Sequence, residues 1–111
     1  MNWTVSYLPE AKEDLKKLDG SIRGQVIKGI RKVAQNPLPK TENGYGSPLG
    51  NKNGADLAGL LKIKFLNIGI RVVYKLVKQD NDMKIIIISA RADNAVYKEA
   101  ANRRKSNNLE K

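Results

Sequence analysis

Three segments in the second half of the chain combine apolar and basic residues in a way that strongly constrains the fold. Segment 61–65 reads Leu-Lys-Ile-Lys-Phe, and segment 70–74 reads Ile-Arg-Val-Val-Tyr. Successive side chains of a strand point to opposite faces of a sheet, so such alternation places the basic residues together on one face. A third segment is almost entirely apolar and ends at Arg91. These patterns predict strands over about 57–66, 70–78 and 84–91, in a sheet with one packed and one cationic face.

The first half of the chain predicts one strand and two helices. Residues 3–7 alternate apolar and polar side chains, as in a short strand. Pro9 suits the start of a helix, where its missing N–H is not needed. Ser21 is expected to cap a second helix, whose apolar face repeats at helical spacing through Ile22, Val26, Ile30, Val33 and Ala34.

The remaining segments complete the predicted topology. Residues 40–56 are rich in Gly and Asn and read as a long loop. Asp93 or Asn94 is expected to cap a last helix that runs to about Arg104, before a polar tail over 105–111. The order β-α-α-β-β-β-α predicts an α+β fold over residues 1–104. In this single domain an antiparallel sheet packs against a helical hairpin and is joined by a C-terminal helix.

The charge of the chain indicates its class of partner. Lys and Arg exceed Asp and Glu by enough to give 111 residues a net charge of +10, with neither His nor Cys. Such a balance favours an acidic partner, nucleic acid above all, over a membrane surface. The absence of Cys excludes disulfides and thiolate metal sites. With no signal-peptide pattern at the N-terminus, we expect a cytoplasmic protein.

The basic face of the predicted sheet is a candidate site. A tight turn at 67–69 would place Lys64 opposite Arg71 and Lys62 opposite Val73, with Lys75 on the same strand. Like charges directly opposite one another destabilise a sheet, which points to a bound anion such as phosphate. The alternative is an ordinary solvated strand face. In the same way Arg91 could cap a helix or pair with Asp93, and Tyr97 could be a half-buried core residue.

Two longer stretches resemble a known family. LLKIKFLNIGIRVVYKLV and IIIISARADNAVY are similar to the RelE/ParE superfamily of toxin–antitoxin toxins, and the resemblance extends over about residues 2–104. Its RelE branch, the ribosome-dependent mRNA endonucleases, has the pattern Lys-x-Lys, then Arg-x-Val-Tyr, then Arg-x5-Tyr. Five residues of this chain match that pattern: Lys62, Lys64, Arg71, Arg91 and Tyr97. A further basic residue of the family's loop has no clear counterpart here, and Lys52 is the candidate for its place.

The resemblance implies a reaction that needs neither metal nor cofactor. The 2′-hydroxyl of RNA attacks the adjacent phosphate, leaving a 2′,3′-cyclic phosphate. Lys62 and Arg71 are candidates to clamp the phosphate, and Lys64 or Tyr97 to act as general base. Arg91 is a candidate to stabilise the leaving group, and Tyr97 could instead stack on a base.

The resemblance also implies the partners. They are the ribosome, whose A site presents the mRNA codon, and a cognate antitoxin, through which the complex would contact operator DNA. Candidate RNA-binding residues outside the catalytic set are Lys52, Lys75, Lys28 and Arg31. Two alternatives stay open: a ParE-type inhibitor of DNA gyrase, and an RNA-binding module without catalytic activity.

Overall fold

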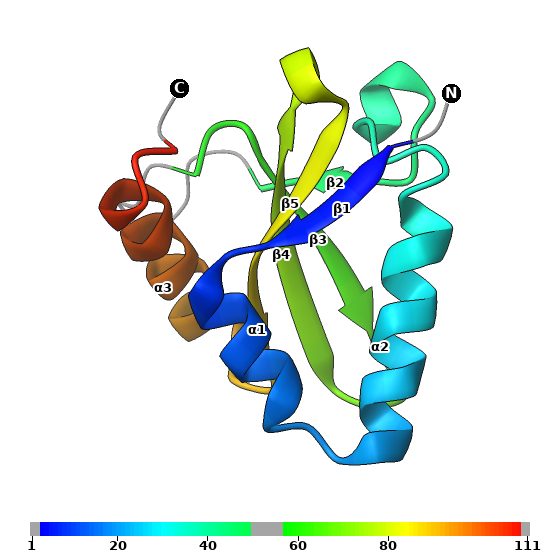
Figure 1. Ribbon diagram of the computed structural model, residues 1–111, viewed down its shortest axis with the longest axis vertical. Helices are drawn as coiled ribbons and strands as arrows, with labels where there is room; N and C mark the ends of the chain where they lie inside the picture. Colours follow the sequence, from blue (N-terminus) through cyan, green and yellow to red (C-terminus); the bar gives the residue numbers. More distant parts are fainter. Residues whose placement is uncertain (1–2, 50–56, 110–111) are drawn as a thin grey trace.

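The computed structural model describes residues 3–49 and 57–109. Its order of elements confirms the predicted β-α-α-β-β-β-α topology and adds a two-residue strand, β2, within the predicted loop (Figure 1). The elements are β1 (Thr4–Tyr7), α1 (Pro9–Lys16), α2 (Gly20–Val33), the 3-10 turn η1 (Lys40–Glu42), β2 (Ser47–Pro48), β3 (Leu60–Phe65), β4 (Ile70–Val77), the 3-10 turn η2 (Lys78–Asp80), β5 (Asp82–Ser89) and α3 (Asp93–Ser106).

The strands form one sheet in the order β1-β5-β4-β3-β2. The pairs from β2 to β5 are antiparallel as predicted, but β1 pairs with β5 in parallel, so the sheet is mixed. The prediction of an antiparallel sheet was wrong for this strand. Short links enforce antiparallel pairing only between strands that a turn joins. β1 instead pairs with a strand far along the chain, where Thr4 N–H donates to Asn81 O at 2.9 Å.

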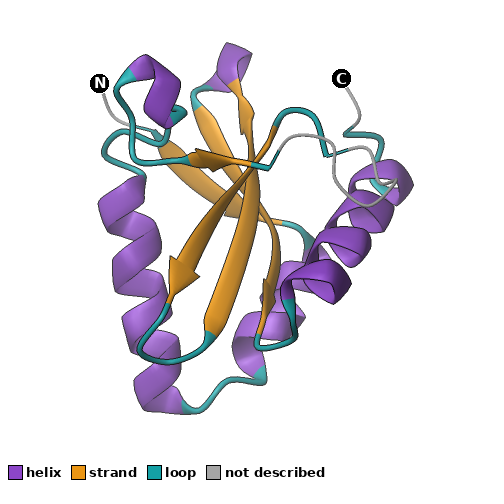
Figure 2. Ribbon diagram, turned by 180° about the vertical axis from the view of Figure 1, so that it is seen from behind, coloured by secondary structure: helices purple, strands orange, loops and turns teal. Residues whose placement is uncertain are grey.

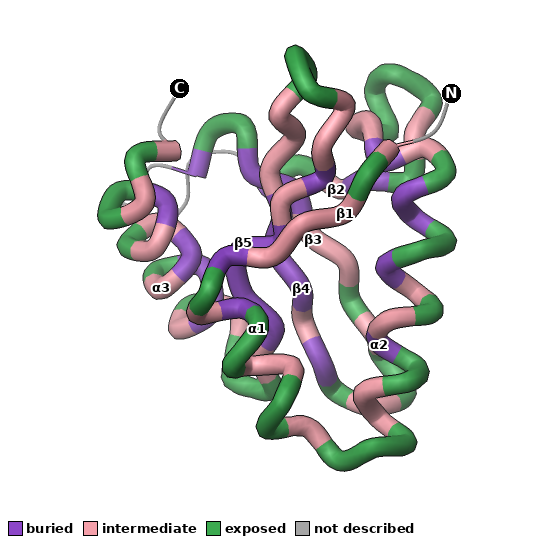
Figure 3. The backbone as a smooth tube through the Cα atoms, viewed as in Figure 1, coloured by how far each residue is buried: buried purple, intermediate pink, exposed green. Residues whose placement is uncertain are grey.

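Helices α2 and α3 lie on opposite faces of the sheet (Figures 1 and 2). α2 packs closely against Phe65 at Gly29, whereas α3 contacts Lys62 and Lys64 on the other face. The core between these layers is built from β4, β5 and the inward faces of α2 and α3 (Figure 3). Its largest fully buried side chains include Tyr74, Ile30, Met83, Ile85, Ile86 and Val26. The alternation along β3 therefore determines which helix each of its side chains meets.

The hairpin of α1 and α2 is joined through polar caps. Asp19, and not the predicted Ser21, caps α2, because the Asp19 carboxylate accepts hydrogen bonds from the backbone N–H and the hydroxyl of Ser21. Arg23 reaches back to the end of α1, donating from Nε to Leu15 O at 3.1 Å and from Nη2 to Leu18 O at 2.9 Å. Arg23 thus supplies donors to carbonyls at and just beyond the end of α1, where intrahelical donors run out.

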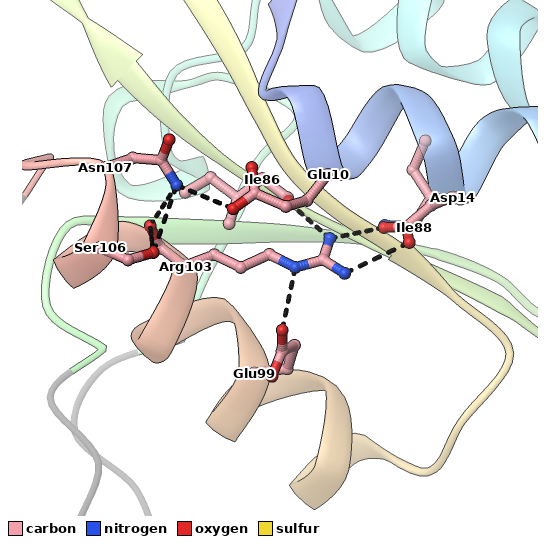
Figure 4. A network of polar contacts seen from close by, with 8 residues as sticks. All are labelled: Glu10, Asp14, Ile86, Ile88, Glu99, Arg103, Ser106 and Asn107. Atoms are coloured by element: carbon pink, nitrogen blue, oxygen red, sulfur yellow. Dashed lines mark hydrogen bonds and ion pairs between the residues drawn. The ribbon is translucent and has the colours of Figure 1, made fainter.

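Arg103 anchors α3 to α1 and to the edge of β5 (Figure 4). β1 pairs with β5 only as far as Ile85, and beyond it the Arg103 guanidinium donates to Ile86 O at 3.0 Å. The same guanidinium lies 2.6 Å from the Asp14 carboxylate, which also accepts the N–H of Ile88 at 3.0 Å. One ion pair thus covers a strand edge that no neighbouring strand protects.

The ends of two predicted segments differ from the structure. α3 continues to Ser106, two residues beyond its predicted end, and Leu109 packs against the core. Part of the predicted 40–56 loop is held to the sheet, since Ser47 pairs with Lys62. Just before this loop, the Tyr74 hydroxyl donates to Pro37 O at 2.8 Å. Burial raises the pKa of Tyr74, which keeps its hydroxyl protonated.

Candidate functional site

The register of β3 and β4 brings two cations face to face. Lys64 lies opposite Arg71 and Lys62 lies opposite Val73, which confirms the pairing predicted from the turn. On the other side of β4, Arg71 lies opposite Ser89 of β5. The basic group therefore sits on the face of the sheet that α3 covers, at the end of β3 nearest the β3–β4 turn.

An acidic residue from α3 lies between these two cations. One Asp93 oxygen accepts from Lys64 Nζ at 2.9 Å, and the other accepts a short hydrogen bond from Arg71 Nε. Arg71 also donates from Nη1 to Arg91 O at 2.9 Å. The hydrogen bond from Lys64, supported by Arg71, holds the pKa of Asp93 below its usual value. The anion expected between the two facing cations is thus the Asp93 carboxylate of the same chain.

Nothing in the sequence pattern singled out Asp93 for this position. It stands at the start of α3, where acidic residues are favoured by the helix dipole, and it was predicted only as a possible cap or partner of Arg91. Its spacing from Lys64 and Arg71 carries no periodic signal. Only the packing of α3 across the sheet reveals the contact.

Tyr97 and Lys62 meet one helical turn further along α3. The Lys62 amine lies 5.7 Å from the centre of the Tyr97 ring, within the range of a cation–π contact. Tyr97 is only 5% exposed, so it belongs to the core as well as to the site.

Among the five predicted catalytic residues, Arg91 differs because no described interaction joins its side chain to Lys62, Lys64, Arg71 or Tyr97. Its backbone carbonyl binds Arg71, while its exposed side chain lines a surface hollow with Asn94, Lys98 and Glu99 on the outer face of α3. Helix α3 begins immediately after Arg91.

The other predicted RNA-binding residues lie apart from this site. Lys75 is further along β4, opposite Leu60 and Lys84, where burial and the charge of Arg104 lower its pKa. Lys28 and Arg31 are exposed on α2, on the other side of the sheet. Lys52 lies outside the described residues.

Comparison with solved structures places the fold. A chain of the Mycobacterium tuberculosis RelBE2 toxin–antitoxin complex is 25% identical, with a TM-score of 0.65 over 84% of this chain and 95% of that one. A mutant of Escherichia coli toxin RelE in the free state is 22% identical, with a TM-score of 0.70 over 93% and 98%. The fold is that of the RelE toxin superfamily. This confirms the resemblance found from the sequence motifs.

Another RelE-fold neighbour comes from a complex. A chain of the intact Escherichia coli RelBE toxin–antitoxin complex is 20% identical, with a TM-score of 0.61 over 81% of this chain and 98% of that one. The sequence itself matches no protein-family model and no curated protein. The likeness therefore lies in the three-dimensional arrangement more than in the sequence.

Neither a metal site nor a membrane-spanning helix occurs in the part of the chain that the structure describes. Over residues 3–49 and 57–109, no three acidic side chains gather as a metal site would require. Over the same residues, no helix is both long and apolar enough to span a membrane.

Proposed function

We propose that this protein is the toxin of a type II toxin–antitoxin system and cleaves mRNA in the ribosomal A site. The observation that carries the proposal is the meeting of Lys62, Lys64 and Arg71 with Tyr97 beneath α3, in a RelE fold. These side chains can bind a phosphate and stabilise extra negative charge on it, which is the main need of RNA cleavage by its own 2′-hydroxyl.

The contacts of Asp93 suggest how a phosphate would bind. A carboxylate that accepts from Lys64 and Arg71 through separate oxygens occupies a two-point oxyanion site, and two phosphate oxygens can replace it. Lys62, on the same face, would contact the phosphate from the side of Tyr97. This arrangement lowers the barrier to a pentacovalent intermediate without metal or cofactor, and the product carries a 2′,3′-cyclic phosphate.

The candidates for general base and for stabilising the leaving group differ in how exposed they are and in whether they lie in the site. Lys64 is a candidate base because its amine lies in the site and part of its side chain is open to solvent. In that role it would act as the neutral amine, and binding of the phosphate would fall to Arg71 and Lys62. Tyr97, as base or as stacking platform, would act only after α3 moves away from β3, because its ring is buried. Arg91 would have to turn its side chain from the outer face of α3 to stabilise the leaving oxygen.

The ribosome would supply the alignment that this site lacks. Lys and Arg titrate far from neutral pH, so the isolated cluster is a weak acid–base catalyst for a free RNA. Lys28, Arg31 and Lys75, together with Lys52, would contact ribosomal RNA through salt-sensitive bonds to phosphates. A cognate antitoxin would restrain the toxin in the cytoplasm, and the complex would bind operator DNA through the antitoxin.

Primer extension on mRNA held in purified ribosomes tests the proposal. We expect wild type to cut at A-site codons and Lys64→Ala or Arg71→Ala to slow cleavage by about 100-fold, as when one charge-stabilising group is removed. Lys78→Ala, which removes an exposed cation from η2, is the matched control and should cut like wild type.

Absence of cuts from folded, antitoxin-free protein would reject the nuclease. A gyrase supercoiling assay would then test the ParE-type alternative, for which Arg91→Ala and Tyr97→Ala should leave toxicity intact. Salt-dependent RNA binding without cleavage would indicate the binding module.

A further inference from the structure

The Lys64–Arg71 pair is already occupied by a carboxylate of the same chain. Asp93 uses both of its oxygens, one for each cation, so neither cation faces an empty site. The three side chains are between about one-quarter and slightly more than one-third exposed, at 34%, 27% and 36% for Lys64, Arg71 and Asp93. Water and a ligand can therefore reach the contact, and a partly exposed ion pair is weak enough to exchange.

We propose that Asp93 is an internal competitor for phosphate at the Lys64–Arg71 site and so sets the concentration of RNA phosphate at which this site fills. The choice of RNA as ligand rests on the function proposed above. Asp93 must leave the two cations before a phosphate can take its place. The observed affinity is then the intrinsic affinity reduced by the fraction of molecules in which the carboxylate is displaced.

A different role for Asp93, as general base toward the 2′-hydroxyl, fits the geometry less well. A base needs an oxygen free to accept the hydroxyl proton, and both oxygens here accept from cations. The hydrogen bond from Lys64 also lowers the pKa of Asp93, which makes it a weaker base. Both facts favour a competitor over a catalyst.

Displacement of the carboxylate does not require α3 to leave the sheet. Asp93 is the first residue of α3, and the turn before it is held without the Asp93 carboxylate, because Arg71 donates to Arg91 O and Arg91 N–H donates to Ser89 Oγ. The far half of α3 is anchored independently through Arg103 and Asp14 (Figure 4). A change of the Asp93 side-chain rotamer alone can therefore open the site.

The competitor favours phosphates that are held in place over those that arrive from solution. A codon fixed beside the site has a high effective concentration and displaces the carboxylate, whereas a loose RNA at low concentration does not. The dependence on the ribosome then has a physical origin within the toxin.

Binding of a short RNA by wild type and Asp93→Asn tests this role. The probe is a fluorescent RNA hexamer with 2′-O-methyl groups at every position, which cannot be cleaved, and its affinity is read by anisotropy. We expect Asp93→Asn to bind about tenfold more tightly than wild type, as the loss of two exposed ion pairs implies. Glu13→Gln makes the same change of charge at an exposed α1 residue that pairs only with Lys16 among the described contacts, and should leave the affinity unchanged.

Three outcomes would overturn the proposal. Equal gains of RNA affinity in Asp93→Asn and Glu13→Gln would reflect net charge alone. No gain of affinity in Asp93→Asn or in the second neutral variant, Asp93→Ser, would show that the carboxylate does not compete. Loss of ribosomal cleavage in Asp93→Asn would identify Asp93 as a base. Thermal melts establish that each variant is folded. Because the probe is not cleaved, absence of nuclease activity in wild type would reject the proposed function without deciding the competition.

Discussion

At the scale of single residues, Asp93 neutralises part of the positive charge of the sheet. Lys64 and Arg71 lie directly opposite one another, a pairing that repulsion alone would disfavour. The carboxylate between them relieves that repulsion and joins α3 to β3 and β4. The same contact therefore serves stability in the free protein and, in our proposal, competes with the ligand.

The pKa of Asp93 leads to a prediction about stability and pH. Lys64, and then Arg71, lower its folded pKa below the ordinary value of 3.8, so its contribution is present above pH 3.8 and is lost as the pH falls through the folded pKa. We expect wild type to be more stable than Asp93→Asn near pH 6 and the difference to shrink as the pH falls below 3.8. Urea unfolding of both proteins across this range checks it, and a difference independent of pH would contradict it.

At the scale of elements, two of the polar contacts that tie α3 to the rest of the fold differ in exposure. Asp93 holds its start at a partly open site, whereas Arg103 holds its far half in contact with Asp14 at a mostly buried one. Burial by itself would lower the pKa of Arg103, but the hydrogen bonds and charges of Asp14 and Glu99 together outweigh it and raise the pKa, so this anchor stays charged.

Removal of the buried anchor should be costly. Asp14→Ala leaves the Arg103 guanidinium and the Ile88 N–H without this acceptor, so we expect a loss of about 3 kcal/mol in the free energy of unfolding. Glu99→Gln removes a more exposed partner of the same guanidinium and should cost less than about 1 kcal/mol. Chemical denaturation distinguishes them, and equal losses would show that Asp14 has no special role.

The contact of α2 with the sheet can be tested through its glycines. A Cβ at Gly29 would collide with the Phe65 ring, whereas one at Gly24 meets nothing within 4 Å. We expect Gly24→Ala to stabilise the protein by about 1 kcal/mol through helix propensity. Gly29→Ala should lose that gain to overpacking and destabilise by about 1 kcal/mol. Thermal melts measure both, and equal stabilisation would mean that Phe65 moves aside freely.

At the scale of the whole molecule, basic residues lie on both sides of the sheet. Of the 21 Lys and Arg residues, Lys62, Lys64 and Arg71 lie on the α3 side, and Lys28 and Arg31 lie on the exposed surface of α2. The two groups are separated by the thickness of the sheet. In our proposal the first binds the reacting phosphate and the second contacts ribosomal RNA.

Salt dependence of ribosome binding should separate these groups. Each phosphate contact adds about one unit to the slope of log affinity against log salt. The double variant Lys28→Gln/Arg31→Gln should therefore lower the slope by about two. Lys40→Gln/Lys78→Gln, which removes two exposed cations from η1 and η2, should leave it unchanged. Equal effects of the two pairs would mean that only the overall charge matters.

Local patterns in the sequence determined the elements, the pairing of Lys64 with Arg71 and the side of the sheet on which the basic residues gather. Side-chain alternation and a short turn act over a few residues, so they can be recognised without knowing the fold. The motifs also indicated the RelE fold, which the solved structures confirm.

The tertiary structure alone decided the parallel pairing of β1, the outward position of Arg91, the burial of Tyr97 and the placement of Asp93 between two cations. Each depends on where a helix or strand packs against residues distant in the chain. Asp93 and Lys64 are 29 positions apart, and no periodicity links them. Packing of α3 across the sheet brings them together, because burial of its apolar side chains sets its position and Asp93 follows.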